Sequence, residues 1–214
     1  MAGATWARAP AAHADGTLDV QILQTASALE AVAVATYGES TTARGLAGLA
    51  GPALSTMRTF VADSRRQHTA HLQAFQARTT AVDPSAKVQD APHPTFQALL
   101  AGADLATPAA LVDFAGLVEQ ATVDTYLRDL TQLTDAPSKA LVAAVMAVAG
   151  QRLAVLRTVK ALLAAGATQF VQVPLSLALL SGVPQAVVPA AFPASLHAVG
   201  PPERIAEPAS GAVR

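Results

Sequence analysis

Two short segments of the sequence repeat the same chemistry-bearing residues at the same spacing. Segment 29–37 contains Glu30 and Tyr37, and segment 118–126 contains Glu119 and Tyr126. In each segment the tyrosine follows the glutamate by seven residues, which is two helical turns, so both side chains lie on one face of a helix. A valine and a threonine also recur at matching offsets, which indicates a duplicated helix pair.

Both glutamates fall on the apolar face of their predicted helices. That face carries Leu23, Ala26 and Ala33 around Glu30, and Val112, Ala115, Val123 and Leu130 around Glu119. A lone carboxylate in such a place is costly, and its pKa rises until it is neutral unless a cation or hydrogen-bond donors compensate. We therefore expect a positive charge between these helices.

Two histidines supply further candidate ligands. His68 and His71 are three residues apart, so both rings can reach one point on the inner face of a helix. With Glu30 and Glu119 they form a nitrogen and oxygen donor set that suits iron, manganese or zinc. The alternative is that both are core histidines hydrogen-bonded to the glutamates. The chain contains no cysteine, which excludes thiolate sites.

The elements that must position these residues are four long helices, predicted over 18–37, 52–79, 108–133 and 136–165. Pro52 lies in the first turn of the second, and Thr107 and Asp135 are candidate N-caps of the last two. Gly166 is a stop signal for the final helix. A crossover with prolines at 84, 92 and 94 and a short helical segment at 96–100 joins the two pairs.

The fold class predicted is all-α: a four-helix bundle of two helix pairs joined by a long crossover, with a Pro-rich C-terminal extension. Hydrophobic residues make up 52% of the chain and aromatic residues only 4%, which favours helices packed through small side chains. We expect a flexible segment at 1–16, the bundle at 17–166, and a tail at 167–214 that is partly packed on the bundle.

The repeated Glu-to-Tyr helices, with a ligand pair on the helix between them, resemble the ferritin-like superfamily, especially its bacterial ferritin-like domain and desiccation-related branch. The resemblance covers residues 18–165. It implies a di-metal site, with one Glu from each of two helices and a Glu-x-x-His pair from each of the other two. It also implies that Glu30 and Glu119 are the single carboxylates and His71 the histidine of the first pair. His68 stands where that pair would have a glutamate.

The second Glu-x-x-His pair is missing from the sequence. Ala149 and Arg152 occupy its positions, and a shifted alignment offers Gln151 and Ala154, which fare no better. Arg152 lies on the apolar stripe of the helix predicted over 136–165. Its guanidinium could hold the buried carboxylates in place of a metal, or it could reach the bundle surface through its aliphatic stem.

Two functions remain open from the sequence. The first is a degenerate metal centre that binds at most one transition-metal ion, iron or manganese; its residues are the ligands Glu30, His68, His71 and Glu119, with Tyr37, Tyr126 and Arg152 around them. The second is a metal-free structural or binding module in which Arg152 neutralises the carboxylates. An enzymatic role would be a metal-dependent oxidase or peroxide-removing activity.

Charge and hydropathy limit the partners. The net charge is -1, with 14 basic and 15 acidic residues, so we expect no nucleic-acid partner. No uninterrupted apolar run is long enough for a transmembrane segment. Homo-oligomerisation stays open. Residues 1–15 lack the apolar region of a signal peptide, but the resemblance and the absence of cysteine favour export to the cell envelope, with the leader removed, over the cytoplasm.

Overall fold

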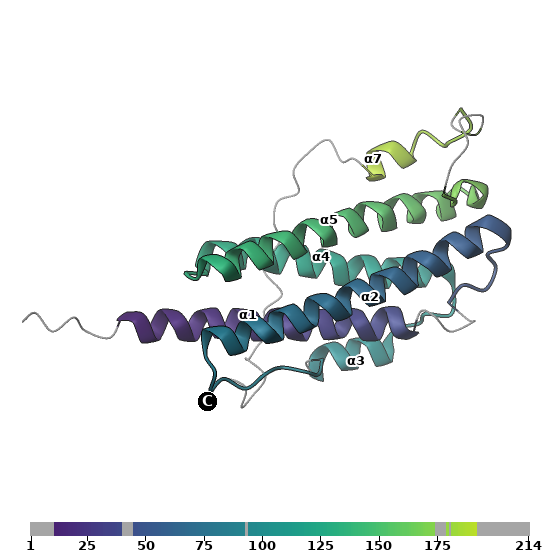
Figure 1. The fold of residues 1–214 in the computed structure, drawn as a ribbon. Coiled ribbons are helices and arrows are strands. Elements are labelled where there is room, and N and C mark those ends of the chain that lie inside the picture. Colours follow the sequence, from purple (N-terminus) through teal and green to yellow (C-terminus); the bar gives the residue numbers. More distant parts are fainter. Residues whose placement is uncertain (1–10, 40–44, 93, 174–178, 180, 192–214) are drawn as a thin grey trace, which may run out of the picture.

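A computed structural model describes residues 11–39, 45–92, 94–173, 179 and 181–191 of the chain. Its frame is four long helices: α1 (Ala11–Glu39), α2 (Gly51–Val82), α4 (Pro108–Gln132) and α5 (Ala136–Ala164). They lie side by side as two hairpins, α1 with α2 and α4 with α5, which meet mainly through α1 and α4 (Figure 1). The predicted all-α four-helix bundle is confirmed.

The long crossover sets the directions of the helices. It leaves α2, passes through the short helix α3 (Pro94–Gly102) beside α1, and returns along the bundle to the start of α4 (Figure 1). Consequently α2 and α4 run in the same direction, and α1 and α4 are antiparallel. The first part of the crossover is tied to the bundle, since Gln24 donates to the Lys87 carbonyl at 2.6 Å and Gln76 to the Gln89 carbonyl at 2.9 Å.

The helix boundaries follow local signals. Thr107 Oγ1 accepts from the Ala110 N–H at 3.2 Å, and the Asp135 carboxylate accepts from the Ser138 N–H at 2.8 Å, as expected of N-caps. At the end of α5, Gly166 has φ +65°, and the Ala167 N–H returns to the Leu162 carbonyl at 2.8 Å. This is the Schellman ending, which requires the left-handed conformation that glycine adopts freely.

Helix α1 begins earlier than predicted. It starts at Ala11, whereas the sequence pattern placed the start at residue 18. The added residues include three alanines and no proline, and alanine has the highest helix propensity, so nothing local stops the helix there. Residues 1–10 lie outside the described part, and the predicted domain boundaries at 17 and 166 stay predictions.

The interior of the bundle contains two apolar clusters with a polar layer between them. Tyr37 belongs to one cluster, with Val61, Val112 and Leu156 among its members. Tyr126 belongs to the other, which includes Leu23, Leu29, Phe75 and Val142. Glu30, His68, Glu119 and Arg152 are all buried in the layer between these clusters. Charged groups placed there are shielded from water on both sides along the bundle axis.

A second polar group fixes one end of the bundle. Asp19 of α1 accepts hydrogen bonds from the backbone N–H groups of Thr134 and Asp135 at 2.9 and 2.8 Å. Arg78 of α2 bonds the Asp135 carboxylate at 2.6 Å through Nη2. Three elements are thereby joined at the α4–α5 turn, which fixes the register of the two hairpins relative to each other.

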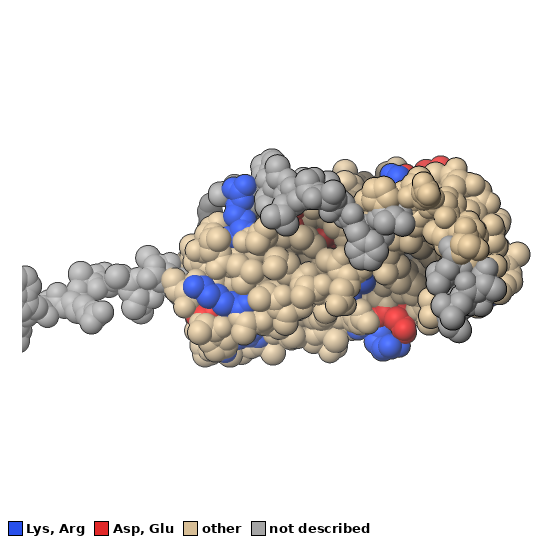
Figure 2. Space-filling model, turned by 90° about the horizontal axis from the view of Figure 1, so that it is seen from above, with Lys and Arg blue, Asp and Glu red and all other residues tan. Residues whose placement is uncertain are grey.

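Beyond α5 the chain folds back onto it. The 3₁₀ turn η1 (Thr168–Phe170) and α7 (Val187–Ala191) bring Val171 and Val187 into the apolar cluster that contains Tyr37. The surface on this side has few charged side chains (Figure 2). Two helical stretches, Thr17–Glu39 and Ala136–Ala164, are long and apolar enough to cross a membrane; they are 72% and 33% buried over their most apolar parts. Core helices of soluble proteins can be equally long and apolar, so length and composition here are weak evidence for a membrane span.

Candidate metal centre

His68 lies at the centre of the polar layer, between two carboxylates. Its Nδ1 is 2.7 Å from Glu30 Oε2, and its Nε2 is 3.0 Å from Glu119 Oε1. All three side chains are fully buried. The imidazole also stacks on the Tyr37 ring, with centroids 5.3 Å apart and an angle of 20° between the planes. The ring is therefore held in position by both of its nitrogens and by one face.

The two tyrosines bond the carboxylates crosswise. Tyr37 of α1 donates to Glu119 Oε1 at 2.8 Å, and Tyr126 of α4 donates to Glu30 Oε1 at 2.6 Å. Because α1 and α4 are antiparallel, a tyrosine two turns beyond the glutamate on one helix lies opposite the glutamate of the other. The repeated spacing in the sequence thus produces a pseudo-symmetric pair of hydrogen bonds.

The surroundings fix the charge of these groups. Burial by itself raises the pKa of Glu30, but the hydrogen bond from His68, the approach of His71, the charge of His68 and the Tyr126 hydroxyl together lower it from 4.5 to about 2. Burial raises the pKa of both Tyr37 and Tyr126 well above 10, and the neighbouring glutamate charges add to the increase. Glu30 is therefore a carboxylate, and both phenols are neutral donors.

The pKa of His68 is subject to two opposing effects. Burial lowers its pKa, but hydrogen bonds to Glu119 and Glu30 and the charges of both carboxylates outweigh burial and raise the pKa above 6.5. Because each ring nitrogen lies within hydrogen-bond distance of a carboxylate oxygen, the site favours the imidazolium form of His68, which can donate to both glutamates. A metal ion at Nδ1 would replace the proton there.

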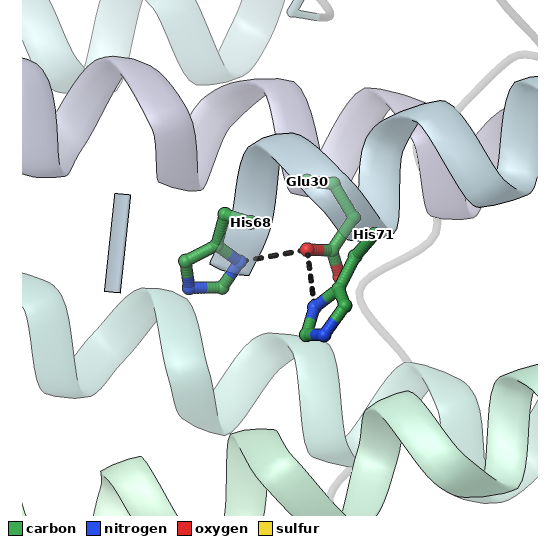
Figure 3. A group of neighbouring side chains, drawn as sticks. All are labelled: Glu30, His68 and His71. Atoms are coloured by element: carbon green, nitrogen blue, oxygen red, sulfur yellow. Dashed lines mark hydrogen bonds and ion pairs between the residues drawn. The ribbon is translucent and has the colours of Figure 1, made fainter. Parts of the chain in front are cut away.

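Glu30, His68 and His71 converge on one point. One donor atom from each lies within 4.8 Å of the others, and the Figure 3 view shows both imidazoles turned toward the Glu30 carboxylate. His71 Nδ1 is 3.3 Å from Glu30 Oε2. Despite this distance, the atom is buried and has no well-formed hydrogen bond to any described residue. A buried imidazole nitrogen without a hydrogen bond beside a carboxylate fits a metal ligand, because a shared cation would satisfy both atoms.

The composition of this group is informative. Two imidazoles and one carboxylate form the donor set of mononuclear sites that keep open coordination positions for exogenous ligands. The His71 side chain is 17% exposed, whereas Glu30 and His68 have no exposed surface. His71 therefore lies at the edge of the core, where an ion or a small molecule could enter from solvent.

Glu119 lies outside this group, on the opposite side of the His68 ring. Arg152 Nε donates to Glu119 Oε1 at 2.8 Å, and Arg152 Nη1 donates to Gln67 Oε1 at 2.8 Å. The Arg152 side chain is only 5% exposed. This low exposure shows that the alternative in which the guanidinium reaches the bundle surface is wrong. The hydrogen bond to Glu119 holds it in the interior, and the one to exposed Gln67 connects it to α2.

The residues of the two alignments considered for a second ligand pair differ in burial. Ala149 and Arg152 are buried facing the polar layer, and Gln151 is exposed. The face of α5 that would carry a second pair of ligands thus holds a methyl group and a guanidinium. Gln67 was not predicted as a site residue, and its only sequence signal is its position immediately before His68.

Comparison with known proteins agrees with this architecture. A family model described as a ferritin-like domain matches residues 18–161 of the chain. Neither the curated proteins nor the solved structures give a significant match.

Proposed function

Because this chain belongs to the ferritin-like domain family, we propose that it binds one transition-metal ion, iron or manganese, through Glu30, His68 and His71. The observation that carries the proposal is the approach of both imidazoles to Glu30 Oε2, at 2.7 and 3.3 Å, with His71 Nδ1 left without a hydrogen bond. These donors lie on α1 and α2 alone, so a single hairpin supplies the whole set.

In this proposal Arg152 takes the place of a second metal ion beside Glu119. The guanidinium is a permanent cation that pairs with Glu119, which removes the need for a second ion there. The di-metal arrangement of the family pattern is thereby divided into a metal half on α1 and α2 and an arginine half on α4 and α5. We infer a stoichiometry of one ion per chain.

A bound ion with open positions would supply Lewis-acid or one-electron chemistry toward oxygen or peroxide. The protein residues have separate tasks around it. Tyr126 holds Glu30 Oε1, which leaves Oε2 directed at the two histidines. Tyr37 stacks on His68 and fixes the ring plane, and the apolar clusters on either side exclude water from the buried donors.

The experiment that tests the proposal is a metal-loading series. The protein is stripped with chelator, loaded anaerobically with Fe(II) or Mn(II), desalted and analysed for metal. We expect one equivalent in the unmodified protein, loss of metal in His71→Ala, and one equivalent in the control Gln73→Ala, which changes an exposed residue of the same helix. Metal retained by His71→Ala, or none bound by the unmodified protein, would contradict the proposal.

A metal-free module is the second candidate function, and one observation favours it. His68 contacts a carboxylate oxygen with each ring nitrogen, so an imidazolium and the Arg152 guanidinium together balance the charges of Glu30 and Glu119. In that case chelator leaves the melting temperature unchanged. A bound ion at 100 times its Kd would instead stabilise the protein by about 2.7 kcal/mol, which thermal denaturation with and without chelator would detect.

A further inference from the structure

Arg152 Nη2 has a long contact with His68 Nδ1 that is at most a weak hydrogen bond. Arg152 Nη2 lies 3.5 Å from His68 Nδ1, which in turn lies 2.7 Å from Glu30 Oε2. Facing a carboxylate, His68 Nδ1 either carries a proton or gives its lone pair to an ion, so it does not accept from Arg152. Arg152 Nη2 carries two N–H groups, and the long contact with His68 Nδ1 can engage at most one of them. Among the described residues the other N–H has no acceptor, and it lies beside the proposed metal ligands.

The charges around this point leave an excess of positive charge when an ion is bound. A divalent ion with Glu30 and two neutral histidines carries one net positive charge. Glu119 and Arg152 cancel each other through their 2.8 Å ion pair. Placed in a buried layer, an uncompensated positive charge favours an anion over a neutral ligand at the open positions of the ion.

We propose that the site takes a small monovalent anion, and that Arg152 binds it through Nη2 while the ion binds it from the other side. This proposal rests on the proposed function, because the anion needs the ion held by Glu30, His68 and His71. A charged donor makes stronger and shorter hydrogen bonds to anions than a neutral donor. Arg152 is then an anion-binding residue as well as the partner of Glu119.

The size of the ligand is limited by the surroundings. Glu30 and His68 are fully buried, and of the three proposed ligands His71, with a 17% exposed side chain, has surface in contact with solvent. Ala149 is the residue that α5 presents to the layer one turn before Arg152. Its side chain is a single methyl group. We infer an anion of about the size of azide.

The test uses Co(II) as the probe metal and azide as the probe anion. Cobalt binding is followed first by its visible absorption, and azide is then titrated into the cobalt-loaded protein. We expect azide to change the spectrum in a saturable way and its Kd to rise about tenfold or more in Arg152→Lys. That variant keeps a cation beside Glu119. The matched control is Arg157→Lys, since Arg157 lies on the same helix and bonds Gln120 instead.

Each outcome decides a separate question. If cobalt does not bind, the proposed function and the anion site are both overturned. If cobalt binds and azide has no effect, or binds equally well to the unmodified protein and Arg152→Lys, the anion site alone is overturned. Should Arg152→Lys be recovered unfolded, the double variant Arg152→Gln with Glu119→Gln removes both charges together, and the same loss of azide affinity is expected.

Discussion

Tyr126 donates a 2.6 Å hydrogen bond to Glu30 Oε1 across the bundle, and the bond is repeated in pseudo-symmetric form by Tyr37 and Glu119 at 2.8 Å. The two tyrosines are equally buried, and each completes an apolar cluster. They differ in one respect. Tyr126 holds a carboxylate of the proposed metal group, whereas Tyr37 holds the carboxylate that Arg152 neutralises.

This difference makes the tyrosines a matched pair for mutation. Tyr126→Phe should destabilise the protein by about 1–3 kcal/mol, because it leaves the buried Glu30 Oε1 without its donor. Tyr37→Phe should destabilise it less, because Glu119 Oε1 keeps its contacts with His68 Nε2 and Arg152 Nε. Only Tyr126→Phe should also weaken metal binding, by roughly 10–100-fold, since it removes the group that orients Glu30. Urea unfolding of the metal-free variants and a metal titration of each separate the two effects. Equal metal affinity in both variants would refute the assignment of Glu30 alone as the carboxylate ligand.

Arg152→Ala should be strongly destabilising. The substitution leaves Glu119 as a fully buried carboxylate without its cation, and removing one partner of a buried ion pair costs about 3–5 kcal/mol. Urea denaturation measures the loss, and Arg157→Ala on the same helix serves as the control. Changing Glu119 to Gln in the Arg152→Ala background should recover part of the stability. An unchanged unfolding midpoint for Arg152→Ala would show that Arg152 does not neutralise the layer.

The stability of the metal-free protein should depend on pH in two opposite ways. Glu30 has its pKa lowered from 4.5 to about 2, so its contribution is present above pH 4.5 and is lost as pH falls from 4.5 toward 2. The shift corresponds to about 3 kcal/mol. His68 has its pKa raised above 6.5, so its contribution is complete below pH 6.5 and is lost as pH rises through the folded-state pKa.

These two groups together predict a maximum of stability between about pH 4.5 and 6.5 in the presence of chelator. Denaturant midpoints measured from pH 3 to pH 9 test this. His68→Gln should remove the decline on the alkaline side and also weaken the decline on the acid side, because the hydrogen bond and the charge of His68 both lower the pKa of Glu30. A midpoint that rises steadily from pH 6 to pH 9 in the unmodified protein would contradict an imidazolium between the two carboxylates.

A second metal position should be recoverable by restoring the missing ligands. Ala149 and Arg152 are both buried facing the layer, one helical turn apart. The double variant Ala149→Glu with Arg152→His would give α5 the Glu-x-x-His pair that the family pattern places there. We expect metal analysis to rise from one to about two equivalents per chain. The single variant Ala149→Glu, which keeps Arg152, is the control and should stay at one.

The sequence determined a large part of this picture. The helical periodicity of apolar residues predicted the four long helices. Thr107 and Asp135 marked helix starts that the structure confirms within a residue. The Glu-to-Tyr spacing predicted which helix faces are buried, and Glu30 and Glu119 are 1% and 0% exposed. These features are local: they depend on helical periodicity and capping, which act over a few neighbouring residues.

The tertiary structure alone decided how the side chains are distributed. The sequence grouped Glu119 with Glu30, His68 and His71, but the antiparallel packing of α1 on α4 places the two glutamates on opposite sides of the His68 ring. It also directs Arg152 inward to Glu119, with a further hydrogen bond to Gln67 of α2. Register and rotation between helices depend on the packing of side chains far apart in sequence, such as Arg78 against Asp135, and helical periodicity carries no information about them.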